Sequence, residues 1–234
     1  MNFDGAEPNG RMCFIEAAIR LLETSGLSEI KARSVSAEAG HSTMGLYKHF
    51  SGMPELLQAV VDEGYRRQAR VFGEAPNTND PMANLYALAL VCRDFAGATP
   101  HLYDLMYGLS IQGRYHNTRG AGTTTLREIS PAFDEVFSHL LRQCELLIEK
   151  GCVRECEPAH IALQFWSTLH GFIILDLAGH LAEVRDPIPT ILMSMCINLV
   201  VGMGASSEAA TQSAANATSL WNRRMASTNC RENK

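Results

Sequence analysis

Five prolines each follow a residue that can begin a helix, and these pairs constrain the fold of the chain more than any other feature. They are Asp80-Pro81, Thr99-Pro100, Ser130-Pro131, Glu157-Pro158 and Asp186-Pro187. Proline is tolerated at the first position of a helix because its missing N–H group has no intrahelical partner there. Between the pairs, apolar residues recur at steps of three and four, which is the helical period, and strand patterns are scarce. The sequence therefore predicts an all-α protein.

The same pattern gives approximate limits for the helices. We predict them over residues 11–25, 34–39, 43–50, 54–72, 81–96, 100–111, 131–150, 158–182 and 187–203. The polar, glycine-rich stretch 112–125 is expected to be a loop. Small polar residues dominate from Gly204 onward, so the segment 204–234 is expected to be a weakly ordered tail.

Composition excludes some kinds of protein. With 20 Lys and Arg against 25 Asp and Glu, the chain cannot hold nucleic acid over its whole surface, so any DNA contact must be local. The N-terminus lacks a basic cluster followed by an apolar run, and the seven cysteines form no Cys-x-x-Cys pair, so a cytoplasmic protein with reduced thiols is expected. The uncharged stretch 187–207 is broken by prolines and glycines, which favours a buried or interface helix over a membrane span.

The most informative stretch is residues 33–50, RSVSAEAGHSTMGLYKHF. Ser34 can cap a short helix, Gly40 stands where a left-handed residue would end it, and Ser42 can cap the next helix. Two short helices joined by a glycine turn make a helix-turn-helix, whose second helix can enter the major groove of DNA. On that helix Leu46 and Phe50 are expected to face the core. The side chains left on its outer side are those of Thr43, Met44, Tyr47 and Lys48.

Together with the preceding RMCFIEAAIRLLETSG and the following PELLQAV, this stretch resembles the DNA-binding domain of the TetR family of transcriptional regulators. The segments TPHLYDLMYG and FWSTLHGFIIL are similar to the C-terminal domain named for its Trp-His-Gly signature, here Trp166, His170 and Gly171. The resemblance implies an N-terminal three-helix DNA-binding head with a helix-turn-helix, over residues 1–52. A larger helical ligand-binding and dimerisation domain would occupy 53–203, followed by the tail 204–234.

The resemblance also implies which residues bind DNA. Some would approach the backbone at the first helix of the motif, some would face bases, and some would touch phosphates. The set is Lys31, Arg33, Ser42, Thr43, Met44, Tyr47, Lys48 and His49. Tyr47 and His49 can instead simply pack, with Lys48 in solvent. Family members usually carry a small apolar residue at His41 and a lysine at Met53, and residues 1–70 hold two lysines and six arginines against nine carboxylates, so this head is weakly charged.

The helix predicted over 158–182 is apolar nearly all round, so a second copy is expected to cover part of it. With 187–203 it would form a four-helix seam in a homodimer, and a dimer would read a palindromic operator. The interface candidates are Leu169, Ile173, Ile174, Leu177, Leu192, Met195 and Leu199. Candidates for an apolar effector pocket, each of which can instead be ordinary core, are Phe95, Tyr103, Met106, Tyr107, Trp166 and His170.

No catalytic signature is present in the sequence, which argues against an enzyme and gives no reason to expect a cofactor. Cys152, Cys156 and His160 are spaced by four, but Pro158 should interrupt a helix through them and a fourth ligand is missing, so no metal site is expected. The sequence predicts a DNA-binding transcriptional regulator, most simply a repressor released from its operator by a small apolar effector. The alternative is a small-molecule-binding or protein-interaction module of the same fold with weak or no specific operator binding.

Overall fold

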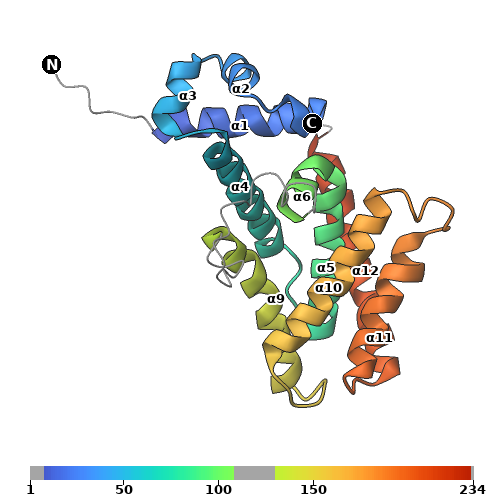
Figure 1. Ribbon diagram of the computed structural model, residues 1–234. Coiled ribbons are helices and arrows are strands. Elements are labelled where there is room, and N and C mark those ends of the chain that lie inside the picture. The colour runs from blue at the N-terminus through green and yellow to red at the C-terminus, as the bar shows by residue number, and fades with distance from the viewer. Residues whose placement is uncertain (1–7, 108–129, 233–234) are drawn as a thin grey trace. The chain divides into compact units, whose positions relative to one another are not determined.

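The computed structural model describes residues 8–107 and 130–232 of the chain, and these residues form ten α-helices with no strand among them (Figure 1). This confirms the all-α prediction. In chain order the elements are α1 (Pro8–Ser25), the 3₁₀ turn η1 (Leu27–Glu29), α2 (Ala32–Glu38), α3 (Thr43–His49), α4 (Met53–Gly73), α5 (Pro81–Ala98), α6 (Pro100–Tyr107), α9 (Pro131–Glu149), α10 (Pro158–Leu177), the π-helical turn η2 (Ile188–Met193), α11 (Ser194–Gly202) and α12 (Ser207–Glu232). The loop predicted over 112–125 lies outside the described residues.

Four of the five prolines begin helices as the sequence predicts, whereas the fifth, Pro187, is the N-cap residue of the π-helical turn η2. The first residues of α5, α6, α9 and α10 are Pro81, Pro100, Pro131 and Pro158. Asp80 caps α5, because its Oδ1 accepts a hydrogen bond of 3.0 Å from the Ala83 N–H. Glu157 makes no such bond at the start of α10. The helical pattern is thus set locally, by residues that the sequence itself identifies.

Several helix limits differ from the prediction, and two of these differences have a clear local cause. Ser34 lies inside α2 and does not cap it, because α2 begins at Ala32 with Lys31 as its N-cap residue. The Val35 N–H already donates to the Lys31 carbonyl at 2.9 Å, which closes the first turn two residues earlier than predicted. The helix α10 ends at Leu177, before the predicted limit at residue 182, because Gly179 takes a left-handed φ of 77° and the His180 N–H donates back to the Leu175 carbonyl.

The prediction of a weakly ordered tail over 204–234 is wrong, because residues 207–232 form α12. Every third or fourth residue of its first half is small and buried; these residues are Ala210, Ser213, Ala214 and Ala217. Small side chains let the helix approach its neighbours closely. Further along, the Trp221 indole N–H donates to the Asp94 carboxylate of α5, and the Arg224 guanidinium donates to the Glu74 carbonyl at 2.6 Å.

The chain divides into two compact units. Unit 1 comprises the described residues of Met1–Arg67 and Ala98–Glu135, and unit 2 those of Gln68–Gly97 and Val136–Lys234. Unit 1 therefore holds the helix-turn-helix, most of α4 and α6, so α6 groups with the helix-turn-helix although it follows α5 in the chain. This division differs from the boundaries at residues 52 and 203 that the sequence suggests.

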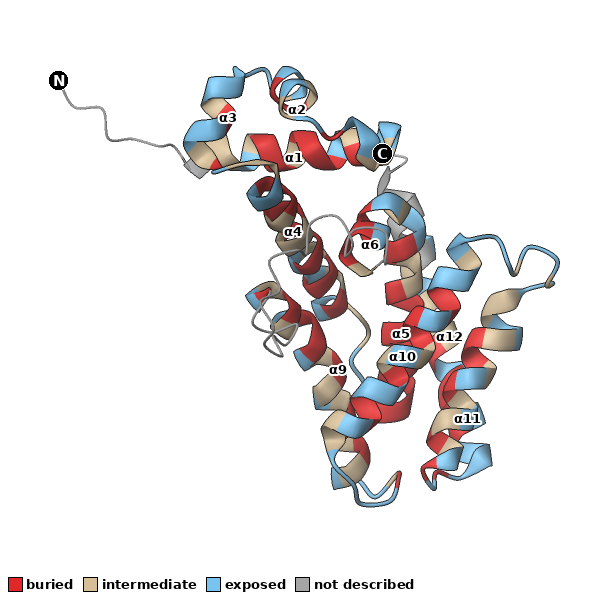
Figure 2. Cartoon of the chain, in the orientation of Figure 1, coloured by how far each residue is buried: buried red, intermediate tan, exposed pale blue. Residues whose placement is uncertain are grey.

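The central helix of unit 2 is α5, which is buried from Pro81 to Cys92 (Figure 2). Polar contacts at its ends connect it to the helices around it. The Asn84 carboxamide N–H donates to the Gln143 side chain on α9, and the Arg93 guanidinium pairs with Asp176 on α10 at 3.1 Å. Because its partners come from several helices, α5 fixes their arrangement in unit 2. None of the helices in the described ranges is long and apolar enough to cross a membrane.

Candidate nucleic-acid interface

The helix-turn-helix in unit 1 is made by α2, α3 and the turn between them. Gly40 takes the left-handed φ of 70° that ends α2, a backbone conformation that glycine adopts without strain. The Ser42 hydroxyl oxygen accepts a hydrogen bond of 3.1 Å from the Gly45 N–H and so caps α3, as predicted. Leu46 and Phe50 are buried, together with Val35 of α2, which confirms their predicted inward orientation. Both helices are therefore held by apolar packing on one side.

The opposite side of α3 is exposed (Figure 2). Met44 is 73% exposed and Tyr47 is 54% exposed, although both are large and one is wholly apolar. Thr43 and Lys48 on the same helix are also exposed. A short helix that is anchored by its core face and presents large side chains to solvent has the form of a recognition surface.

The remaining predicted DNA-binding residues flank this surface within unit 1. Lys31, Arg33 and Ser42 are exposed, and the Lys31 ammonium lies 3.3 Å from the Glu29 carboxylate. His49 is half-buried, because its ring packs on Phe14 with the ring centroids 5.9 Å apart. A Cβ atom at Gly10 would lie only 2.9 Å from His49 Nε2, so glycine at position 10 leaves the room that this imidazole occupies.

One basic residue beside this surface was missed by the sequence reasoning. The Arg11 guanidinium lies over the Phe50 ring, 4.7 Å from its centroid, and 3.9 Å from the Glu55 carboxylate. Glu55 also accepts hydrogen bonds from the Ser51 N–H and hydroxyl at the start of α4, and these bonds lower the pKa of its carboxyl group. In the sequence, only the position of Arg11 at the start of an amphipathic helix could have indicated that this arginine lies beside α3.

Unit 1 also joins α1 and α4 to α6. The Glu23 carboxylate of α1 accepts a hydrogen bond of 2.8 Å from the Leu102 N–H in the first turn of α6. On α4, the Tyr65 hydroxyl donates to the Met106 carbonyl at 3.1 Å. Burial raises the pKa of that hydroxyl, so it stays protonated and remains a donor. These contacts link residues that are far apart in the sequence, so no local sequence pattern predicts them.

The six effector-pocket candidates divide between the units. In unit 1, Tyr103 and Tyr107 pack with ring centroids 4.7 Å apart, and Met106 is buried beside them on α6. In unit 2, Phe95 is buried, and the Trp166 and His170 rings pack with centroids 4.1 Å apart. Burial lowers the pKa of His170 to about 3, so its imidazole is neutral at pH 7.

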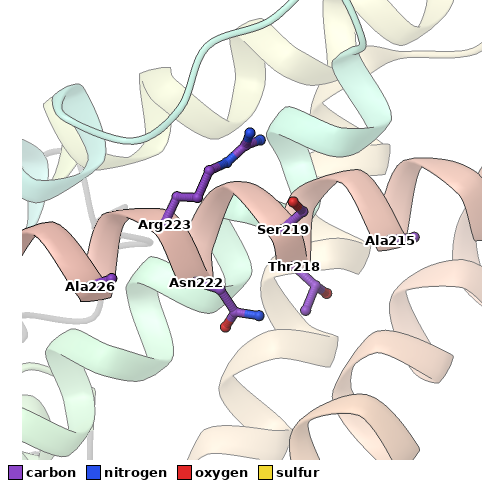
Figure 3. A pocket seen from close by; sticks show the side chains of 6 residues that line it. All are labelled: Ala215, Thr218, Ser219, Asn222, Arg223 and Ala226. Carbon is purple, nitrogen blue, oxygen red and sulfur yellow. The ribbon is translucent and has the colours of Figure 1, made fainter.

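None of these six residues lines either of two hollows that are formed by described residues of unit 2. One, of about 200 Å³, lies among Phe72, Gly73, Ala75, Pro76, Asn77, Asn84, Leu88, His139 and Gln143. The other is a shallow, open depression along α12, lined by Ala215, Thr218, Ser219, Asn222, Arg223 and Ala226. Figure 3 shows the Arg223 and Asn222 side chains splaying apart, and the steps of three and four between the six lining residues place them all on one face of α12. They do not converge on one point.

The interface candidates require a correction. Leu169, Ile173 and Leu192 are buried within the single chain, so they belong to the core of unit 2 and cannot contact a second copy. Ile174, Leu177 and Met195 are exposed, and Leu199 is partly exposed. Two further apolar residues that the sequence reasoning did not select, Leu163 and Leu175, are about half exposed on α10. An all-round apolar helix does not indicate which of its faces the rest of its own chain covers.

Within the described ranges, no group of three or more His, Cys, Asp and Glu side chains could hold a metal ion.

The helix-turn-helix and the division into two units define a class of protein, in which a helix-turn-helix unit is followed by a larger helical unit. Comparison with known proteins makes the class specific. The family model described as bacterial regulatory proteins, tetR family, matches residues 14–60. The model described as the tetracyclin repressor-like C-terminal domain matches residues 85–196, which include Trp166, His170 and Gly171.

Relatives and solved structures agree with the family models. An uncharacterized HTH-type transcriptional regulator of Mycobacterium tuberculosis is 24% identical over 203 residues, which cover 82% of this chain and 81% of that protein. A protein of unknown function from Rhodococcus sp. RHA1 has the same fold, with a TM-score of 0.66, 23% identity and coverage of 86% of this chain and 99% of the other. The structure of RolR in complex with resorcinol has a TM-score of 0.59 and 14% identity to this chain. The match covers 88% of this chain and 93% of RolR. The chain belongs to the TetR family of transcriptional regulators.

Proposed function

We propose that the protein binds double-stranded operator DNA by placing α3 in the major groove. The observation that carries this proposal is the outer face of α3, where Met44 and Tyr47 are exposed while Leu46 and Phe50 anchor the helix. In a helix-turn-helix, residues on the outer face of the second helix contact base edges, and the first helix crosses the backbone. The major groove carries a distinct donor, acceptor and methyl pattern for each base pair.

The proposed contacts divide by chemistry. Thr43, Met44 and Lys48 face bases, where the ammonium can donate to guanine O6 and N7 and the methionine can contact a thymine methyl group. Tyr47 and His49 contact phosphates. Lys31, Arg33 and Ser42 approach the backbone at either side of the turn. The exposed Lys31–Glu29 pair costs little to break, because surface ion pairs contribute about 0–1 kcal/mol.

A homodimer supplies the second recognition helix. Its proposed interface is the α10–α11 patch, which we define as Leu163, Ile174, Leu175, Leu177 and Met195. Leu163 and Ile174 share a face of α10 with Ser167 and Gly171, which are exposed and small enough to let another helix approach. Two copies would then read a palindromic operator with half-sites about one helical turn, or roughly 34–36 Å, apart.

The protein is proposed to be a repressor that a small apolar molecule releases from DNA. The match to a tetracyclin repressor-like C-terminal domain supports repression, and the resorcinol bound to RolR, an aromatic ring with two hydroxyl groups, supports a small organic effector. The helix α4 runs without a break from Met53 in unit 1 to Gly73 in unit 2, so it offers a continuous element for coupling. A coupling free energy of about 1–3 kcal/mol between effector and operator is typical of such regulators.

Selection of bound duplexes from random DNA, at one stated salt concentration, tests the proposal. The expected result is enrichment of a two-fold symmetric sequence, and loss of that enrichment with the Thr43→Ala, Lys48→Ala double variant. A matched control is Arg185→Ala, which removes a cation whose side chain is 97% exposed in unit 2. If the wild-type protein enriches no sequence, the protein is instead a small-molecule-binding or protein-interaction module of this fold.

A further inference from the structure

A single aromatic ring supports two imidazoles at the two ends of α3. Phe14 of α1 is buried in the core of unit 1. The His41 ring centroid lies 5.3 Å from the Phe14 centroid with the rings tilted by 46°, and the His49 centroid lies 5.9 Å away with a tilt of 50°. His41 belongs to the turn that precedes α3, and His49 is the last residue of that helix. Both rings therefore flank the proposed recognition helix from a shared base.

The fold leaves His41 at the surface. The His41–Phe14 contact lies beside Gly45 of α3, where a Cβ atom would be 3.6 Å from Phe14 Cζ and 3.9 Å from His41 Cβ, which are ordinary van der Waals distances. His41 is exposed and sits directly before Ser42, the exposed cap of α3. A buried imidazole would need a hydrogen-bond partner, whereas at this position the polar edge can meet an external one. One part of the ring is fixed by packing, and the rest is available to a partner.

The chemistry of this surface points to phosphate oxygens as that partner. An imidazole donates an N–H to a phosphate oxygen, and it adds a positive charge when it takes up a second proton. The charged groups on the elements around the two imidazoles include Arg11 and Arg20 of α1, Glu38 of α2, Lys48 of α3 and Glu55 of α4. Arg11 is paired with Glu55, and Arg20 with Glu38. Because residues 1–70 carry nine carboxylates against eight lysines and arginines, two added charges change the local balance substantially.

Building on the DNA-binding function proposed above, we propose that His41 is a further DNA-contacting residue. Together, His41 and His49 hold the phosphate backbone of one strand from the two ends of α3, and operator affinity therefore increases as the pH falls. The sign follows from linkage. A phosphate beside an imidazole favours the protonated form, so the complex binds more protons than the free protein does. Lowering the pH then shifts the equilibrium toward the complex.

The test measures fluorescence anisotropy of a labelled duplex, obtained by selection with the wild-type protein, at pH 8 and at pH 6 and at constant ionic strength. We compare the wild type with His41→Gln, which keeps a neutral donor but cannot take up a proton. The control is His180→Gln, which changes an exposed histidine of unit 2. The double variant His41→Gln, His49→Gln tests whether the two imidazoles act together. Thermal melting of each protein shows that it is folded at both pH values.

The wild type should bind about three- to tenfold more tightly at pH 6 than at pH 8, as expected for two weak exposed ion pairs in each protomer of a dimer. His41→Gln should lose much of that difference, the double variant should lose nearly all of it, and His180→Gln should keep it. At pH 6 the salt dependence of binding should also be shallower for His41→Gln, by about 0.9 for each phosphate that the imidazolium no longer neutralises.

Two results would overturn the proposal, and they are distinct. If His41→Gln keeps the affinity, the pH ratio and the salt dependence of the wild type, His41 does not contact DNA, while the DNA-binding function stands. If the wild type binds no selected duplex at either pH, the DNA-binding function fails, and the role of His41 fails with it.

Discussion

A glutamate placed at Leu169 or at Ile174 of α10 should have two different consequences. Leu169 is 2% exposed and faces the core of unit 2, whereas Ile174, five residues later on the same helix, is 47% exposed and belongs to the α10–α11 patch. Both substitutions introduce the same side chain into the same helix. Their difference therefore reports only which face of α10 each position occupies.

The magnitudes follow from burial. At Leu169 an unpaired buried carboxylate costs about 3–5 kcal/mol, and the removal of the buried leucine adds about 2 kcal/mol. That sum is a large part of the roughly 5–15 kcal/mol that stabilises a typical domain, so Leu169→Glu should unfold unit 2 or leave it barely stable. At Ile174 the single chain loses only about 1 kcal/mol, because half of the side chain is already exposed.

In the proposed dimer, Ile174→Glu acts twice, once in each copy. Each copy loses the remaining burial of the isoleucine and places a carboxylate in an apolar seam, so the dimer should be weakened by at least about 3 kcal/mol, or more than about 100-fold. Sedimentation equilibrium measures the dimer dissociation constant, and urea unfolding measures the stability of each variant. A folded Ile174→Glu protein that dimerises as tightly as the wild type would refute the assigned interface, and a stable Leu169→Glu protein would refute the assigned core.

Three further outcomes are expected. Gly64→Ala should destabilise unit 1 by about 1 kcal/mol in urea unfolding, because the added Cβ would lie 2.6 Å from Met106 Sδ. In a Met106→Ala background the same change should be neutral or stabilising. An equal effect in both backgrounds would contradict this packing. Burial lowers the pKa of His170 to about 3 from a usual value of 6.5, so the unfolded chain binds a proton that the folded chain does not, and the free energy of unfolding should fall by about 2 kcal/mol between pH 7 and pH 5. His170→Leu should lack that part of the pH dependence, and an unchanged slope would show that His170 does not cause it. Met53→Lys should tighten binding to all DNA sequences and steepen the salt dependence by about 0.9 for each phosphate that the new cation neutralises, whereas unchanged affinity would show that the start of α4 lies away from DNA.

Features fixed by neighbouring residues were predictable from the sequence. The proline-started helices, the Ser42 cap, the Gly40 turn and the inward orientation of Leu46 and Phe50 all depend on interactions within a few residues. The amphipathic period of a short helix also tells which of its faces is outer. For this reason the spacing of Leu46 and Phe50 was enough to predict which face of α3 is exposed, and the family resemblance added its role in DNA binding.

Features fixed by distant partners were not predictable. The helix α12 looks like a polar tail by composition, because the burial of Ala210 and Ala217 depends on helices elsewhere in unit 2. The bond from the Leu102 N–H to Glu23 joins residues 79 positions apart, which no local pattern specifies. On α10, apolar residues surround the helix, so the sequence could not separate the buried Leu169 from the exposed Ile174.

The central claim is that the outer face of α3 reads DNA, and the dissociation constant of Lys48→Ala on the selected operator tests it most directly. The measurement is an anisotropy titration on the operator and on duplexes changed at one base pair in each half-site, with Arg185→Ala as the matched loss of a cation in unit 2. The account predicts that Lys48→Ala loses about 1–3 kcal/mol on the operator and no longer distinguishes one base position per half-site, while Arg185→Ala binds as the wild type does. If Lys48→Ala keeps both the affinity and the base preference of the wild type, α3 does not read DNA in the proposed orientation.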